Sequence, residues 1–299
     1  MTMAIDAGFL DELSRLEAAL RRETDSRRQG EQRSPDVGEG LTFSDYRRYT
    51  PGDDLRLIDW RVYARTDEYF IKQFEAERDL TVHVLVDASA SMAYGEGDAH
   101  KFEFAAKVGL GFAFFAAAGH DTFRVAVIND GVERLDRRRS TRGELLRLLE
   151  SVNRIDPAGR TDFRTGLESY ARTIRSRSLV VVVSDFLDDP DAIEDGVAAF
   201  GDSDVLLVHA VAPTERDPDT TGDTVFEDPE TGATHRAYFA GSTADAYRDR
   251  LRAHADEVEA RARVLGAEHV VVDTGTDVLD AFTEVWRRDA ARARAERRR

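Results

Sequence analysis

The chain has 299 residues, no cysteine and a formal net charge of −16. The lack of cysteine excludes disulfides, thiolate metal sites and cysteine nucleophiles, and the acidic surface disfavours nucleic acid because phosphates repel it. No long apolar run and no secretory signal are present, so we expect a globular cytoplasmic protein. Scarce lysine beside abundant aspartate is typical of salt-accumulating microbes such as haloarchaea, where carboxylates keep the surface hydrated.

The N-terminal region, residues 1–37, is predicted to hold one helix and a linker. Residues 4–22 carry leucines at helical spacing with charged residues between them, which predicts an amphipathic helix packed on its own domain. Residues 24–39 are polar and contain Gly30 and Pro35, so we expect a linker there.

The second region, residues 38–78, interleaves tyrosine, tryptophan, arginine and aspartate without a clear helix or strand period. We therefore expect an ordered but irregular segment, in which Arg guanidinium groups pair with carboxylates against aromatic faces. The alternative is a partner-docking surface, because Tyr, Trp and Arg dominate protein interfaces. The candidate residues for either role are Arg47, Tyr49, Asp53, Arg56, Asp59, Trp60 and Arg65.

The third region, residues 79–299, alternates short apolar runs with helical patterns, which predicts an α/β fold with a doubly wound, mostly parallel sheet. The segment 132–136 is expected to pair back antiparallel, and a hairpin or loop excursion is expected at about 213–240. We expect strands at 80–86, 123–129, 178–184, 205–211 and 269–272, and helices at 101–118, 145–149, 165–174, 191–200, 245–265 and from 278 onward.

Oxygen-bearing side chains follow the first of these strands. Asp87, Ser89 and Ser91 alternate with alanines, but three oxygens are fewer than the roughly six that Mg²⁺ needs. Thr161, before a predicted helix, and Asp185, after a second buried strand, could supply the others, because adjacent parallel strands end at one edge of a sheet. Alternatively, such residues are helix N-caps, an interpretation that suits the neighbouring Asp162 equally well.

At Asp87, Ser89, Ser91, Thr161 and Asp185 the chain resembles the von Willebrand factor A family, whose metal-ion-dependent adhesion motif is Asp-x-Ser-x-Ser with a distant Thr and Asp. The resemblance implies that the two serines and the threonine are direct ligands. It also implies that the two aspartates act directly or through water. We expect Mg²⁺, with Mn²⁺ or Ca²⁺ as alternatives.

A second resemblance covers residues 47–65, which resemble the signature of the DUF58 family, Arg-x-Tyr-x-x-Gly-Asp-x-x-Arg-x-Ile-Asp-Trp followed by Ala-Arg. The matching residues are Arg47, Tyr49, Gly52, Asp53, Arg56, Ile58, Asp59, Trp60, Ala64 and Arg65. This resemblance implies a partner, a MoxR-type AAA+ ATPase, for which the protein would act as an adaptor in assembly or metal insertion.

We therefore predict a non-enzymatic, divalent-metal-dependent protein-binding module with no catalytic residues. Neutral hydroxyl ligands leave a bound cation electron-poor, so an acidic side chain of another protein can complete its shell. The alternatives are a metal-dependent phosphoester hydrolase and a structural scaffold whose metal site is empty or only stabilising. The chain has no Gly-x-Ser-x-Gly elbow, no phosphate-binding Gly-x-x-x-x-Gly-Lys loop and no His-x-x-x-His pair.

Overall fold

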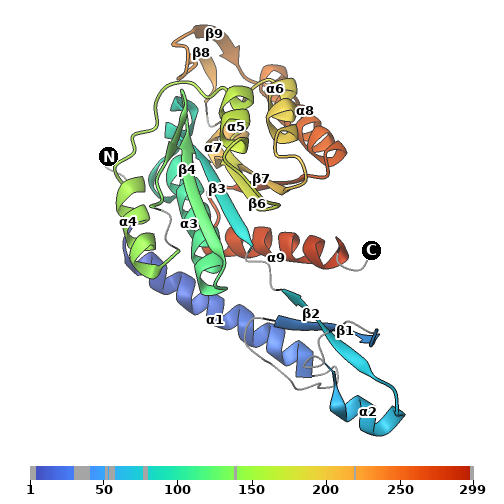
Figure 1. The fold of residues 1–299 in the computed structure, drawn as a ribbon. Coiled ribbons are helices and arrows are strands. Elements are labelled where there is room, and N and C mark those ends of the chain that lie inside the picture. Colours follow the sequence, from blue (N-terminus) through green and yellow to red (C-terminus); the bar gives the residue numbers. More distant parts are fainter. Residues whose placement is uncertain are drawn as a thin grey trace. The chain divides into compact units, whose positions relative to one another are not determined.

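The chain divides into two compact units, residues 1–19 with 80–299 and residues 20–79. The computed structural model describes residues 5–29, 41–50, 53, 58–76, 80–137, 140–218 and 220–296. The larger unit is an α/β fold with helices on both faces of one sheet (Figure 1).

The sheet of the larger unit has six strands in the order β10-β7-β6-β3-β4-β5. Its strands are β3 (Thr81–Asp87), β4 (Thr122–Ile128), β5 (Val132–Arg134), β6 (Leu179–Ser184), β7 (Asp204–Val211) and β10 (Glu268–Asp273). All neighbours are parallel except β4 and β5, which confirms the predicted sheet and its antiparallel return. The chain moves from β3 to β4 on one side and later to β6 on the other, so the strand order reverses between β3 and β6. Ligands of such sheets bind at the carboxyl edge of this reversal point.

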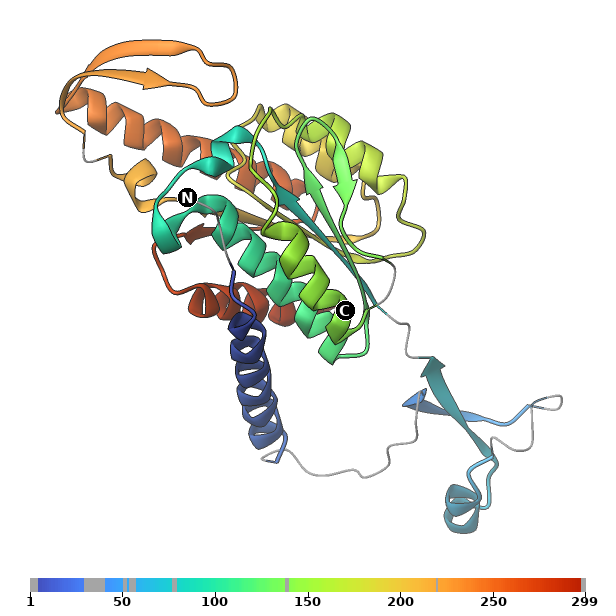
Figure 2. The same cartoon turned by 90° about the vertical axis from the view of Figure 1, so that its left-hand side faces the viewer.

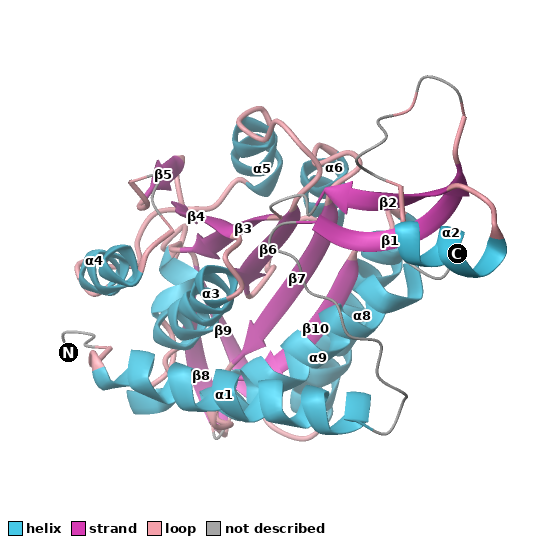
Figure 3. Cartoon of the chain, turned by 60° about the horizontal axis from the view of Figure 1, so that its bottom comes forward, coloured by secondary structure: helices cyan, strands magenta, loops and turns pink. Residues whose placement is uncertain are grey.

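Two groups of helices cover the two faces of the sheet (Figure 3). The group around α3 (Lys101–Ala118) includes α4 (Arg142–Val152) and α9 (Val278–Glu296), and the opposite group holds α5 (Phe163–Ala171), α6 (Pro190–Ala198) and α8 (Ser242–Val264). Among the described helices, none combines the length and the apolar character needed to cross a bilayer.

Strand β3 is buried on both faces, as expected for a central parallel strand. Leu85 packs with Phe163 and Leu167 of α5 on one side. On the other side Val84 faces α3, where a Cβ added at Gly109 would lie 2.9 Å from its Cγ1. The glycine therefore lets α3 approach the strand closely.

Helix α1 (Gly8–Gln29) is the predicted N-terminal helix, with Leu10 and Leu13 buried. It is longer than expected, so a linker starting at residue 24 is wrong. The reason is local: residues 24–29 are polar but contain neither glycine nor proline, and Gly30 is the first helix breaker after them. Residues 30–40 lie outside the described residues.

The smaller unit holds an antiparallel pair, β1 (Leu41–Arg48) with β2 (Phe70–Ala76), and the short helix α2 (Trp60–Thr66). The expectation of an irregular segment is therefore wrong for these residues. A register shift between Phe43 and Asp45 interrupts the strand pairing, and such a bulge also breaks the period-two pattern by which a strand is recognised in a sequence.

The excursion predicted at about 213–240 consists of the short helix α7 (Pro213–Arg216) and a hairpin of β8 (Gly222–Glu227) and β9 (Thr234–Phe239). The hairpin projects from the larger unit (Figure 2). At its base Phe239 is buried, 5.3 Å from the Phe226 ring and 5.9 Å from the Tyr247 ring of α8, measured between centroids.

Candidate metal centre

Two loops meet at the carboxyl edge of the sheet, one after β3 and one before α5. Backbone hydrogen bonds join them: Ala158 N donates to Ala88 O at 2.9 Å and Ala90 N donates to Gly159 O at 3.0 Å. This pairing brings Thr161, distant in sequence, next to the end of β3.

Asp87 is the buried centre of the site. Its Oδ1 accepts hydrogen bonds from the Ser89 N–H at 2.9 Å and the Thr161 hydroxyl at 2.7 Å, and its Oδ2 accepts one from the Ser184 hydroxyl at 2.6 Å. The Thr161 hydroxyl donates its proton to Asp87, so the lone pairs of the Thr161 oxygen remain free to bind a cation. The carboxylate therefore orients neighbouring oxygens.

Ser89 and Ser91 place two further oxygens at the same edge, with their Oγ atoms 3.0 Å apart. Two oxygens bound at right angles to one Mg²⁺ at about 2.1 Å are themselves about 3.0 Å apart. The spacing of the two serines therefore suits neighbouring positions on one cation.

Asp185 lies on the adjacent strand end and is held by a buried lysine. Lys101 Nζ donates to Asp185 Oδ2 at 2.6 Å and to Glu215 Oε1 at 2.9 Å. The second oxygen of Asp185 accepts from Leu187 N at 3.3 Å, and Ser91 lies close enough to this carboxylate to lower its pKa. Asp185 therefore lies beside one of the two serines.

Ser184, Lys101 and Glu215 belong to this arrangement but were not predicted. Ser184 ends a run of four valines, so the sequence indicates only a strand terminus. A possible signal for Lys101 was present: it is one of few lysines in an arginine-rich chain, and it opens an apolar helix. Nothing in the local sequence of Glu215 distinguishes it from a surface residue of α7.

The charges of the site favour a cation. Burial raises the pKa of Asp87 to about 6, and repulsion from Asp185 adds to this, against the hydrogen bonds that Asp87 accepts. Burial acts the same way on Asp185, but the charge and hydrogen bond of Lys101 outweigh it, so the pKa of Asp185 lies below its usual value. The carboxylates outnumber the single ammonium group, and a divalent cation would relieve their repulsion.

The donor set fits a hard divalent cation. Hydroxyl oxygens of Ser89, Ser91 and Thr161 face the site, while the carboxylates of Asp87 and Asp185 are occupied by hydrogen bonds and would act mainly through water. Within the described part of the chain, no three His, Cys, Asp or Glu side chains form a group that could hold a metal. The site would thus rely on neutral oxygens, which suit Mg²⁺, Mn²⁺ or Ca²⁺. Metal binding itself stays a prediction.

Asp162 has a structural role. Its carboxylate accepts hydrogen bonds from Thr165 N at 2.9 Å and from the Thr165 hydroxyl at 2.8 Å, which caps α5 and lowers the pKa of Asp162. Asp162 is interpreted from the sequence either as part of the metal site or as a helix N-cap, and its contacts are those of an N-cap.

The candidate residues of the smaller unit make local contacts. Arg47 forms a two-pronged pair with Asp53, both bonds 3.0 Å long, and this hydrogen bonding holds the pKa of Asp53 below its usual value. Asp59 caps α2 by accepting from Arg61 N at 2.8 Å. Arg47 and Asp53 thus form one Arg–carboxylate pair, whereas Asp59 is a helix cap; the expected network stays a prediction, and Arg56 lies outside the described residues.

Aromatic rings gather on the same unit. Tyr63 and Tyr69 stack with ring centroids 4.6 Å apart, and Tyr49 and Trp60 meet the Tyr69 ring edge-on. Trp60 is 60% exposed, and Arg65 Nε donates to the backbone of its own helix. An exposed aromatic cluster is compatible with the docking alternative, which stays a prediction.

Comparison with known proteins identifies the family. Residues 45–261 match the family described as "Protein of unknown function DUF58", and the chain belongs to it. It is 26% identical over 290 residues to "Uncharacterized protein Rv1480" of Mycobacterium tuberculosis, covering 96% of this chain and 89% of that protein. The same values hold for "Uncharacterized protein Mb1516" of Mycobacterium bovis.

Solved structures with similar architecture include the "conserved hypothetical protein BatB" from Bacteroides thetaiotaomicron, at 12% identity and a TM-score of 0.46 over 71% of this chain and 99% of that one. A "von Willebrand factor type A" protein from Catenulispora acidiphila is 14% identical, with a TM-score of 0.42, and the match covers 71% of this chain and 42% of that one. The SpRpn10 VWA domain is 13% identical, with a TM-score of 0.41, and the match covers 69% of this chain and 94% of that one.

Proposed function

We propose that the protein is a divalent-metal-dependent protein-binding module without catalytic activity of its own. The observation that carries the proposal is the group of three hydroxyls, from Ser89, Ser91 and Thr161, gathered beside the buried carboxylate of Asp87 at the reversal point of the sheet. When bound, a divalent cation would supply one coordination position for an acidic oxygen of a partner. Asp87 orients the Thr161 hydroxyl, and Lys101 offsets the charge of Asp185.

The chemistry of the site favours an acidic partner. Neutral hydroxyl ligands do not cancel the charge of a dication, whereas a carboxylate from outside would. The DUF58 resemblance supports a MoxR-type AAA+ ATPase as the partner class, with this protein as its adaptor or companion. On this proposal the interaction requires both the metal and one Asp or Glu of the partner.

The test is affinity purification from native lysate at high salt, in Mg²⁺ or in EDTA. Ser91→Ala and Thr161→Val remove one ligand each. Ser151→Ala is the matched control, because its hydroxyl donates to Arg147 O within α4. We expect one specific partner whose recovery falls several-fold with EDTA and in both ligand variants, and stays unchanged in the control. Equal recovery under all conditions would overturn the proposal.

The same proteins separate the two alternatives. Mg²⁺-dependent turnover of 4-nitrophenyl phosphate that is lost in Ser89→Ala would support a hydrolase instead. A melting temperature that rises with Mg²⁺, without any metal effect on partner recovery, would support a structural scaffold.

A further inference from the structure

The turn of the β8–β9 hairpin directs one acidic side chain inward. Among residues 227–236 every residue is exposed except Glu230, whose side chain is 19% exposed. The turn is organised around Asp228, which accepts hydrogen bonds from Glu230 N at 2.9 Å, from the Thr231 hydroxyl at 2.5 Å and, at its backbone oxygen, from Gly232 N at 2.8 Å. Glu230 is therefore held in position by the turn itself.

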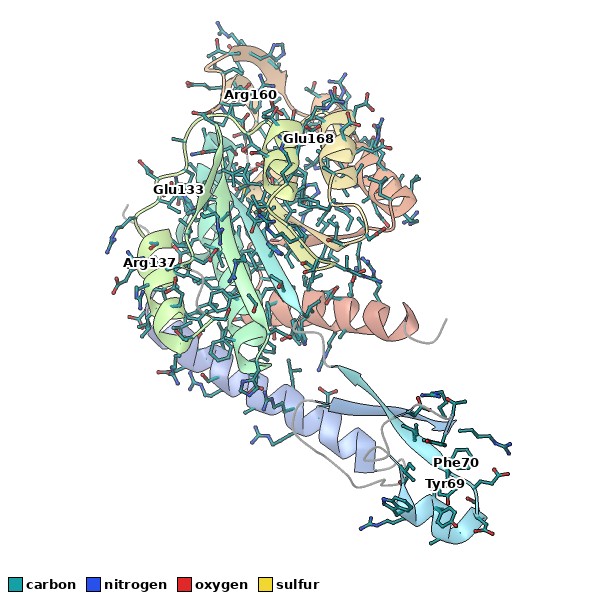
Figure 4. All side chains as sticks on the ribbon, in the orientation of Figure 1. Tyr69, Phe70, Glu133, Arg137, Arg160 and Glu168 are labelled. Carbon is teal, nitrogen blue, oxygen red and sulfur yellow. The ribbon has the colours of Figure 1, made fainter. Side chains whose placement is uncertain are left out.

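Glu230 points toward the candidate metal centre. Its Oε2 lies 3.9 Å from Nε of Arg160, the residue before Thr161, and Figure 4 shows Arg160 where the loop before α5 meets the hairpin. Ser89 and Ser91 lie close enough to the same carboxyl group for their hydroxyls to lower its pKa. An acidic side chain of this chain thus lies beside two of the three proposed ligand hydroxyls.

This placement is electrostatically unfavourable when no cation is present. Glu230 is partly buried and lies near enough to Asp87 and Asp185 for their negative charges to repel its own carboxylate. A divalent cation between these carboxylates would turn repulsion into attraction. The contact of the hairpin with the site should therefore strengthen when metal binds.

The apolar anchoring of the hairpin lies on one of its faces, where the ring of Phe239 at the base contacts Phe226, nearer the turn, and Tyr247 of α8. On the opposite face Val225 and Tyr238 are 60% and 71% exposed. The tip meets the site through polar contacts of Glu230. Such contacts can be exchanged for equivalent ones from another carboxylate without unfolding the base.

We propose that Glu230 is an internal acidic ligand of the metal centre, occupying the position that an acidic side chain of the partner takes. This inference rests on the proposed function and adds its regulation: the partner has to displace the hairpin tip. Because coupling is reciprocal, metal holds the tip in place and Glu230 strengthens metal binding.

The experiment combines calorimetric titration with Mg²⁺ and hydrogen exchange of residues 228–233. It compares the wild type with Glu230→Gln and with Glu227→Gln, an exposed glutamate of the same hairpin. We expect Mg²⁺ to slow exchange at the tip of the wild type and of the control. In Glu230→Gln we expect at least about fivefold weaker Mg²⁺ binding and no slowing at the tip. At saturating Mg²⁺ this variant should recover more partner than the wild type.

The outcomes distinguish the two proposals. If Glu230→Gln binds Mg²⁺ and protects the tip as the wild type does, the internal-ligand inference fails while the metal-dependent function stands. If the wild type binds Mg²⁺ without any change at the tip, Glu230 is only an ion-pair partner of Arg160 and the inference also fails. If neither the wild type nor the control binds Mg²⁺, the proposed function fails and the inference with it.

Discussion

Lys101 is the residue on which the charge balance of the site depends. Its ammonium group is buried between Asp185 and Glu215, and their charges keep its pKa raised although burial alone would lower it. Removing one partner of a buried ion pair typically costs about 3–5 kcal/mol, because the other charge is left uncompensated. We therefore expect Lys101→Met to lower the free energy of unfolding by an amount in this range, measured by urea denaturation in EDTA.

The matched control for this prediction is Lys107→Met on the same helix. Lys107 pairs with Glu103 one turn away, near the surface, where such a pair contributes about 0.3–0.5 kcal/mol. If both variants lose the same free energy of unfolding, the charge of Lys101 contributes no more to stability than the charge of Lys107 does.

His83 carries a prediction about acid stability. Burial lowers its pKa from 6.5 to about 4, helped by the charge of Arg124, and its Nδ1 lies 2.9 Å from the Tyr170 hydroxyl. Because the unfolded chain takes up the proton first, the contribution of His83 to stability is complete above pH 6.5 and is lost as the pH falls toward 4. The loss approaches about 1.4 kcal/mol for each pH unit in this window.

We expect His83→Gln, which can still hydrogen-bond Tyr170, to lose less stability than the wild type between pH 6.5 and 4. Denaturation curves across this window measure the difference. Asp87 works in the opposite direction, since its raised pKa favours the folded state at low pH, but it is present in both proteins and cancels. Parallel pH profiles for the two proteins would contradict the assignment.

Residues of the candidate site differ in how well the sequence predicts them. The motif starting at Asp87 is contiguous and follows an apolar strand, so the topology rule alone places Asp185 on the same edge. Glu230 lies in a polar stretch whose composition indicates a solvated loop. Its approach to Ser89 depends on the length and anchoring of a hairpin, which no local pattern encodes.

At the scale of elements, the pairing of the two loops depends on Gly159. Its φ is +81°, and a Cβ there would lie 2.8 Å from Oδ1 of Asp130, which also accepts from Arg160 N. The left-handed backbone alone costs a residue with a side chain about 1–2 kcal/mol. We expect Gly159→Ala to destabilise the protein by at least this amount and to weaken Mg²⁺ binding, because Thr161 follows in the same loop.

Gly131 is the control for this change, since a Cβ there meets nothing within 4 Å. Gly131→Ala should stay within about 0.5 kcal/mol of the wild type, as surface substitutions usually do. Denaturation and calorimetric titration of both variants provide the measurements. If Gly159→Ala is destabilised but binds Mg²⁺ as tightly as the wild type, the conformation of this loop does not determine Mg²⁺ binding.

Elements buried on both faces were predictable, and exposed ones less so. The strands β3 and β6 are continuous apolar runs, so their sequence indicates them directly. The hairpin of β1 and β2 was missed because a bulge breaks its alternation. The C-terminal part of α1 is hard to predict because its polar composition is also typical of a linker, although a helix ends at backbone breakers and not where the sequence becomes polar.

At the scale of the whole molecule, the net charge of −16 should make stability depend on salt. Repulsion between surface carboxylates opposes folding, and its range falls from about 10 Å in 0.1 M salt to about 3 Å in 1 M salt. We expect the melting temperature to rise with KCl, with most of the rise at the lower concentrations where screening changes fastest. A melting temperature independent of KCl would contradict the salt-adapted character inferred from composition.

Screening and specific binding differ in a way that the same measurement can resolve. At equal ionic strength KCl and MgCl₂ screen surface charges to a similar extent, whereas a ligand at 100 times its Kd adds about 2.7 kcal/mol to the stability of a protein that binds it only when folded. At equal ionic strength, we expect the melting temperature of the wild type to be higher in MgCl₂ than in KCl. We expect this difference between the two salts to vanish in Thr161→Val. Thr283→Val, which removes a hydroxyl that donates to Leu279 O within α9, should keep it. Coinciding curves for the two salts in the wild type would mean that the hydroxyl cluster holds no divalent cation.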